Sequence, residues 1–187
     1  MTSIIGLLVN IAFYGLIFVF SLYFQRINGL SPFATGLAFV PMMGAVLPAN
    51  LLASRAAERI GAPATIAAGA ALSAFGCLML IGIEPDTRYW EIVAQLTIIG
   101  AGLGLLVPPL TSTLLGSVEK SRSGIAAGVL NATRQTGSVL GVALFGSLLG
   151  QAEAFVTGAH AALMISTGLL LLAAMLIWRG APQTGRV

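Results

Sequence analysis

Apolar residues fall into six runs along the chain, each long enough to cross a bilayer as a helix. A spanning helix needs about 20 predominantly apolar residues, and almost every charged residue lies between the runs. The connections are short, so we expect consecutive helices to be antiparallel neighbours. The pattern predicts six transmembrane helices at about 4–24, 32–53, 63–83, 89–115, 123–149 and 159–178.

A polar stripe interrupts the fifth of these runs. Arg134 has Asn131, Gln135 and Ser138 three or four residues away, so all four side chains project from one side of a helix. An arginine near mid-membrane costs about 2.5–3.5 kcal/mol on insertion-based scales. Polar groups at that depth are tolerated where they face protein or a water-filled cavity. The stripe therefore indicates a transport pathway or an interface with another half of a protein.

The other polar positions separate the six runs into two kinds. The runs at 63–83 and 159–178 contain no Asn, Gln or charge in their interiors, and we expect them to face lipid. The other four runs should line a wetter space. Their remaining candidates for the pathway or interface are Asn10, Tyr14, Gln25, Asn50 and Gln95.

This division recurs with a period of three helices. A three-helix unit reverses its direction in the membrane when it is repeated, which gives an inverted pair. The expected fold is therefore an all-α integral membrane domain, with six transmembrane helices arranged as a 3+3 inverted repeat over residues 1–187.

Small residues and prolines indicate how the helices pack. Glycines four residues apart let helix backbones approach closely, and prolines remove a backbone donor and kink helices. These positions are explained either by tight packing alone or by a face that slides and a helix that hinges during transport. Hydroxyls in Thr111–Thr113 are placed to satisfy carbonyls that the prolines free. The candidates for hinges and close packing are Pro41, Pro48, Gly100, Gly104, Pro108, Pro109, Gly124, Gly128, Gly137 and Gly141.

Composition fixes the class of protein. The chain is 57% hydrophobic and 8% charged, with a mean hydropathy of +0.97, whereas soluble domains are about 25% charged. Its +3 charge is too scattered for nucleic acid. The sequence has one cysteine, no metal-ligand set and no catalytic constellation. We therefore expect an integral membrane protein that is not an enzyme and needs no metal or cofactor.

Positive residues predict the orientation, because Lys and Arg favour the cytoplasmic side. The connections after the first, third and fifth runs carry only Arg26 and Arg88. Both termini should therefore be cytoplasmic, in the plasma (inner) membrane. The other connections and the C-terminal tail carry Arg55, Arg59, Lys120, Arg122, Arg179 and Arg186.

Several stretches, in this order, resemble the C-terminal half of a major facilitator superfamily transporter, most closely the fourteen-helix drug:proton antiporter branch. The 124–137 stretch is the most specific of them. One of these stretches, at 52–61, resembles the family's basic cytoplasmic turn and contains Arg55, Glu58, Arg59 and Gly61. It departs from the family at Ser54 and Glu58, where the family often has Gly and Asp. The stretches are Ser21–Gln25, Gly29–Leu37 with Pro41, Leu52–Gly61, Gly102–Leu105 with Pro108–Thr111, and Gly124–Gly137.

The resemblance implies two six-helix halves that rock around a central cavity. It implies proton-driven export of small amphipathic, often cationic compounds. A full transporter of this kind is about twice as long, so the implied partners are the lipid bilayer, a substrate, and an N-terminal six- to eight-helix half or a second membrane chain. Two alternatives stay open: a non-transporting membrane subunit or assembly module, and a half-transporter that pairs with itself.

Overall fold

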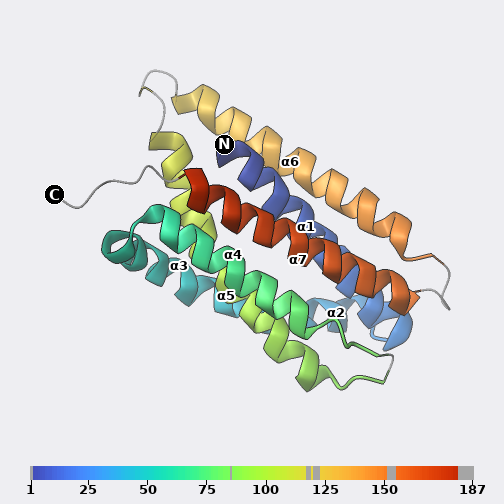
Figure 1. Cartoon of the computed structure of the whole chain (residues 1–187). Coiled ribbons are helices and arrows are strands. Elements are labelled where there is room, and N and C mark those ends of the chain that lie inside the picture. The colour runs from blue at the N-terminus through green and yellow to red at the C-terminus, as the bar shows by residue number, and fades with distance from the viewer. Residues whose placement is uncertain (1, 85, 117–118, 120–122, 151–154, 181–187) are drawn as a thin grey trace.

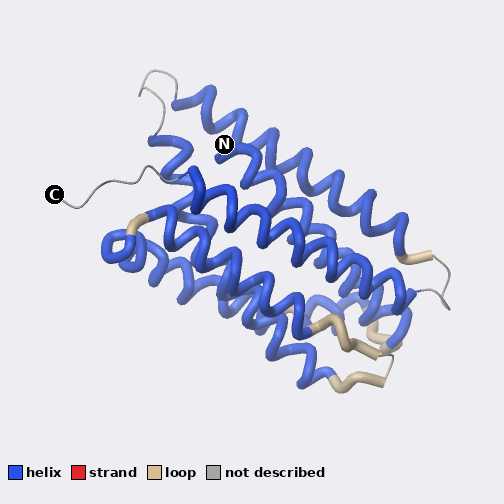
Figure 2. The backbone as a smooth tube through the Cα atoms, in the orientation of Figure 1, coloured by secondary structure: helices blue, strands red, loops and turns tan. Residues whose placement is uncertain are grey.

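The structure is a computed structural model that describes residues 2–84, 86–116, 119, 123–150 and 155–180. Helices account for every regular element in these residues (Figures 1 and 2). Lys120, Arg122 and Arg186, which contributed to the predicted orientation, lie outside them. The elements are α1 (Thr2–Leu22), the π-helix η1 (Tyr23–Ile27), α2 (Pro32–Ala38), α3 (Val40–Ile60), α4 (Ala62–Met79), α5 (Tyr89–Gly116), α6 (Ser123–Leu148) and α7 (Phe155–Gly180).

Five spans within the described residues are long and apolar enough to cross a membrane: Thr2–Ile27, Pro32–Ile60, Ala62–Met79, Tyr89–Gly116 and Phe155–Gly180. The sixth long helix, α6, does not reach that apolarity because it carries the polar stripe. It nevertheless runs the length of the bundle beside α1 (Figure 1). A helix that lines a cavity tolerates polar residues that a lipid-facing helix does not.

The helix contacts repeat when the first three spans are exchanged with the last three. The first span, α1, packs on α6 and α7, while the fourth, α5, packs on α3 and α4. The third and sixth spans, α4 and α7, pack on each other. Exchanging α1 with α5, α3 with α6 and α4 with α7 converts each of these contacts into another one that is present. This relation confirms the expected 3+3 arrangement.

The expectation that consecutive helices are neighbours is only partly right. It holds for α4 and α5, which pack closely, but α1 and α3 share no extensive contact. A short connection fixes where two helices meet at their ends, and it does not decide which faces pack along their length. The pairs α3 with α5, α4 with α5 and α1 with α6 pack closely, and glycines lie at each of these interfaces, where they let the backbones approach.

The second span is broken once and runs further than predicted. Ser31 caps it, with its hydroxyl accepting a hydrogen bond from the Ala34 N–H at 3.2 Å. The helix stops at Phe39 and restarts as α3, with Pro41 in its first turn, where the absence of a proline N–H costs least. The new helix then continues to Ile60 rather than ending near residue 53.

The predicted cytoplasmic turn is therefore wrong as a turn. Arg55, Glu58 and Arg59 are exposed residues in the last two turns of α3, and only Gly61 separates α3 from α4. Gly61 adopts a φ of +87°, a conformation that favours glycine. Arg and Glu are good helix formers, and a helix can continue past the hydrocarbon into the polar interface.

The other prolines do not interrupt their helices. Pro48 lies inside α3, and Pro108 and Pro109 lie inside α5. Because Pro108 and Pro109 have no N–H, the carbonyls of residues 104 and 105, four residues earlier, lose their helical donors. The nearby hydroxyls donate to other carbonyls. Thr111 donates to the Val107 carbonyl at 2.9 Å, and Thr113 donates to the Pro109 carbonyl at 2.7 Å.

Some glycines make the expected close contacts between helices and others do not. A methyl group added at Gly100 would meet the Met42 backbone of α3, and one at Gly104 would meet the Ala49 Cβ at 2.5 Å. Gly137 and Gly141 lie close to α1: an added methyl would meet the Asn10 Cβ at 2.8 Å from Gly137 and the Ile11 carbonyl from Gly141. For Gly124 and Gly128 the expectation is wrong within this chain: an added Cβ would meet no described atom within 4 Å. Small side chains permit close approach, but a partner helix must be present to use it.

Two ends of the bundle differ in charge. Figure 1 places the N-terminus, the α3–α4 junction and the start of α6 at one end. Arg55 and Arg59 lie at the end of α3, and Arg179 lies in the last turn of α7, at this same end. Arg26 and Arg88 belong to the opposite end.

Candidate functional site

Two adjoining spaces open on the polar side of the bundle. The first, which we call the four-helix cavity, has a volume of about 310 Å³ and is lined by α1, α3, α5 and α6. The second, the α6 groove, has a volume of about 780 Å³ and runs along α6 opposite Tyr14 of α1. Tyr14 and Arg134 line both spaces, so they form the boundary between them.

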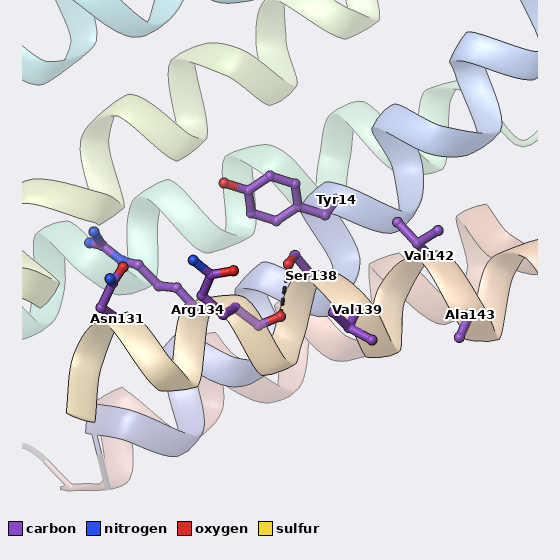
Figure 3. A pocket seen from close by; sticks show the side chains of 8 residues that line it. Tyr14, Asn131, Arg134, Ser138, Val139, Val142 and Ala143 are labelled. Atoms are coloured by element: carbon purple, nitrogen blue, oxygen red, sulfur yellow. Dashed lines mark hydrogen bonds between the residues drawn. The ribbon is translucent and has the colours of Figure 1, made fainter. Parts of the chain in front are cut away.

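The α6 groove contains the whole polar stripe. Asn131, Arg134 and Ser138 lie along one side of α6 with the Tyr14 ring across from them (Figure 3), and Gln135 lines the same groove. The Ser138 hydroxyl donates to the Gln135 carbonyl at 2.8 Å. Further along the helix the lining becomes apolar, with Val139, Val142 and Ala143. The helical spacing in the sequence is thus realised as one continuous surface that grades from polar to apolar.

Arg134 is held by a neutral partner. Its Nη2 donates to the hydroxyl of Thr111 on α5 at 2.8 Å, and that hydroxyl donates in turn to the Val107 carbonyl at 2.9 Å. The side chain is only partly buried. Arg134 is the only charged residue among the described residues that line either space. The two spaces therefore share one positive charge, that of Arg134. The other described residues that line them are apolar, or polar and uncharged.

Two asparagines face the four-helix cavity with different partners. The Asn10 side-chain amide donates to the Gly6 carbonyl, one turn earlier in α1, at 2.6 Å. Asn50, on α3, has a buried Oδ1 with no hydrogen-bond partner among the described residues. An unsatisfied buried acceptor costs about 1–3 kcal/mol. The buried Oδ1 of Asn50 is thus an acceptor on the cavity wall that no described residue uses.

The remaining predicted site residues lie elsewhere. Gln25 belongs to η1 and donates to the Ser21 hydroxyl at 3.1 Å. Gln95 is half-buried on α5, with its Oε1 unpartnered among the described residues. Neither residue lines the cavity or the groove. The residues Arg55, Glu58 and Arg59 lie at the charged end of α3.

Sequence reasoning did not assign Thr111 to the site. It treated that hydroxyl as a partner for backbone carbonyls, and Thr111 does bond one, but the same oxygen also accepts from Arg134. A signal was present, because a threonine two residues after Pro109 lies on a helix that is expected beside the stripe. Its register relative to Arg134 depends on how α5 and α6 pack, which a single sequence does not specify.

A sequence model of the Major Facilitator Superfamily matches residues 2–187. The chain belongs to this superfamily. The family is one of transporters, and together with five helices that are apolar enough to span a bilayer it makes the chain an integral membrane protein. The cavity between α1, α3, α5 and α6 is therefore a feature of a transporter fold.

Several relatives in this superfamily carry the names of resistance proteins. The methylenomycin A resistance protein of Bacillus subtilis (strain 168) is 33% identical over 93% of this chain and 38% of its own length. The puromycin resistance protein pur8 of Streptomyces alboniger is 32% identical over 90% and 38%. The multidrug resistance protein Stp of Mycobacterium tuberculosis is 34% identical over 74% and 26%. The chain thus spans well under half the length of these relatives.

A solved structure shares the same helix arrangement. The crystal structure of a peptide transporter, POT, in its E310Q mutant form with sulfate, superposes with a TM-score of 0.73. The match covers 94% of this chain and 36% of that one, at 19% sequence identity. At this identity the likeness supports the fold alone, and it agrees with the assignment to the superfamily.

Proposed function

We propose that the chain is one six-helix half of a secondary active transporter that exports small molecules. The observation that carries the proposal is the pair of adjoining spaces bounded by Tyr14 and Arg134, which lie between the helices of a major facilitator fold. The names of the relatives, which concern resistance to methylenomycin A, to puromycin and to several drugs, support export as the direction of transport.

The lining supports an amphipathic substrate. Polar contacts come from α6 and from Asn10 and Asn50, while Phe13 and Met43 supply apolar surface in the four-helix cavity. Small-molecule sites have this composition, with mostly apolar walls and a few placed polar groups. We propose that Asn10, Tyr14, Asn50 and the α6 stripe contact substrate along the path. Gln25 and Gln95 remain proposed for the interface with the other half.

A second six-helix half completes this proposal. The helices α3 and α6 expose long apolar faces, among them Leu47 and Leu51 on α3 and Ile125 and Val129 on α6. Both helices also line the four-helix cavity, and Gly124 and Gly128 of α6 have no described atom within 4 Å of an added Cβ, which leaves room for a close partner. We infer that an N-terminal half or a second membrane chain packs here.

Proton drive and orientation belong to the same proposal. No acidic residue lines the cavity or the groove in the described part of the chain, so we assign the coupling carboxylate to the other half. The end that carries Arg55, Arg59 and Arg179 is proposed to be cytoplasmic, because positive residues favour that side.

A transport assay tests this function directly. The full-length protein, which here means this chain together with the half that completes it, is expressed in a pump-deficient bacterial host, and accumulation of puromycin, ethidium and dansylglycine is compared with that in vector-only cells. We expect lower accumulation of at least one compound, with recovery to the vector level when a protonophore collapses the proton gradient. Accumulation equal to that of the vector for a wide compound panel, with normal membrane expression, would favour a non-transporting subunit instead.

A further inference from the structure

The charge at Arg134 has no acidic counterpart among the described residues that line the cavity and the groove. The guanidinium has five N–H donors and no acceptor. Thr111 accepts from Nη2, and it is a neutral hydroxyl. Among the described residues that line the four-helix cavity and the α6 groove, none is a carboxylate. This half of the path therefore presents a fixed positive charge with donors available to a ligand.

Asn50 lines the same cavity and offers a hydrogen-bond acceptor rather than a donor. Its Oδ1 is an acceptor that is buried and has no partner among the described residues. Arg134 lies on α6 and Asn50 on α3, and both line the four-helix cavity. A ligand that spans the cavity would therefore meet donors at one wall and an unused acceptor at the other.

Apolar side chains fill the walls around these two groups. Phe13 comes from α1, Met43 and Val46 from α3, and Leu103 and Val107 from α5. The volume of about 310 Å³ is at the small end of ordinary ligand sites, which measure about 300–1,000 Å³. A compact amphipathic molecule matches these dimensions and this distribution of polar groups.

We propose that the four-helix cavity binds a small amphipathic compound with a carboxylate or another strong acceptor against Arg134 and an N–H or O–H donor against Asn50. The inference rests on the proposed function, and it names the chemical class of substrate for that same site. It reverses the expectation of a cationic substrate for this wall, because an organic cation would bring like charge to Arg134 without a carboxylate to offset it.

Two matched probes test the inference. Dansylglycine and dansylcadaverine share a fluorescent ring and a sulfonamide N–H, but the first carries a carboxylate and the second an ammonium group. Binding to the full-length protein in phosphatidylcholine nanodiscs is followed by dansyl emission, with empty nanodiscs subtracted. We expect dansylglycine to bind at least tenfold more tightly than dansylcadaverine.

Three variants separate a local charge from general effects. Arg134→Gln should raise the Kd of dansylglycine at least tenfold, the size expected for a lost charge-assisted hydrogen bond, while the Kd of dansylcadaverine stays equal or falls. Asn50→Asp should lower the Kd of dansylcadaverine and raise that of dansylglycine. Arg55→Gln removes the same charge at the end of α3, outside both spaces, and should leave both constants unchanged.

The possible results distinguish a failure of this inference from a failure of the proposed function on which it rests. Equal affinities for the two probes, or an Arg134→Gln effect that is the same for both in a protein with unchanged thermal melting, would overturn the inference. Export in the accumulation assay together with that result would leave the proposed function intact. Selective, Arg134-dependent binding without any export would support the site and remove the exporter role.

Discussion

Arg134 of α6 donates a 2.8 Å hydrogen bond to the Thr111 hydroxyl of α5, although these two helices otherwise share few contacts. The same hydroxyl donates to the Val107 carbonyl, directly before Pro108. The bond thus connects the charge of Arg134 to the proline-containing stretch of α5. A displacement of either helix would alter the position of the guanidinium in the cavity.

Removing the Thr111 hydroxyl should therefore act through Arg134. We expect Thr111→Val to lower the export rate several-fold, because a hydrogen bond to a charged group contributes about 1.5–3 kcal/mol. In an Arg134→Gln background the same substitution should have much less effect, since the two residues then no longer interact. Export rates of the two single variants and the double variant give the coupling.

The matched control for that cycle is Thr133→Val. The Thr133 hydroxyl bonds only the Val129 carbonyl of its own helix among the described residues, and it lines neither space. It should leave export near the wild-type rate. Fully additive effects of Thr111→Val and Arg134→Gln would count against a functional link between these residues.

The glycine contacts predict opposite effects of one substitution at two sites. Gly100→Ala should destabilise the protein by about 1–3 kcal/mol, because the new methyl meets the Met42 backbone in a packed interface. Gly168→Ala in α7 should be neutral or stabilising, since alanine is favoured over glycine in helices by about 1 kcal/mol and no described atom lies within 4 Å of the added methyl. Thermal unfolding in mild detergent compares them, and equal shifts would contradict the packing described.

Two side chains, one from the first three spans and one from the last three, contact backbone carbonyls of the connection between α4 and α5. The buried Tyr23 hydroxyl donates to the Glu84 carbonyl at 2.6 Å, and the His160 ring lies 2.7 Å from the Ile83 carbonyl. Tyr23→Phe should lower the free energy of unfolding by about 1 kcal/mol. Tyr14→Phe is the control, because no hydrogen bond from the Tyr14 hydroxyl occurs among the described residues, and a loss as large there would refute this account.

The orientation is open to a direct chemical test. Cys77 is buried, and Cys77→Ala supplies a background for single exposed cysteines. In intact cells, a membrane-impermeant maleimide should label Asp86→Cys, which lies in the α4–α5 connection, and should spare Glu58→Cys at the end of α3. Both substitutions remove one carboxylate, so they are matched in charge. The reverse labelling pattern would invert the proposed topology.

The sequence was sufficient for features that depend on periodicity. Helical spacing placed Asn131, Arg134 and Ser138 on one side of a helix, and they line one groove. The contrast between polar and apolar runs also identified the four helices around the cavity. These inferences need only the geometry of a single helix and the high cost of polar groups in lipid.

Features that depend on relations between helices were out of reach. The break at Phe39 reflects local geometry around Pro41, while Pro48, in the same span, leaves the helix continuous. Gly100 meets a partner helix and Gly128 does not, although each belongs to a pair of glycines four residues apart. The Thr111–Arg134 bond requires the relative register of α5 and α6. One sequence contains no direct record of such pairings.

The most direct test of the central claim is export of dansylglycine by the full-length protein with Arg134→Gln, measured beside Arg55→Gln at equal membrane expression. If the four-helix cavity and the α6 groove form the path, Arg134→Gln should reduce the initial export rate at least tenfold, and Arg55→Gln should leave it within twofold of wild type. Wild-type export by Arg134→Gln would show that this wall of the bundle does not lie on the transport path.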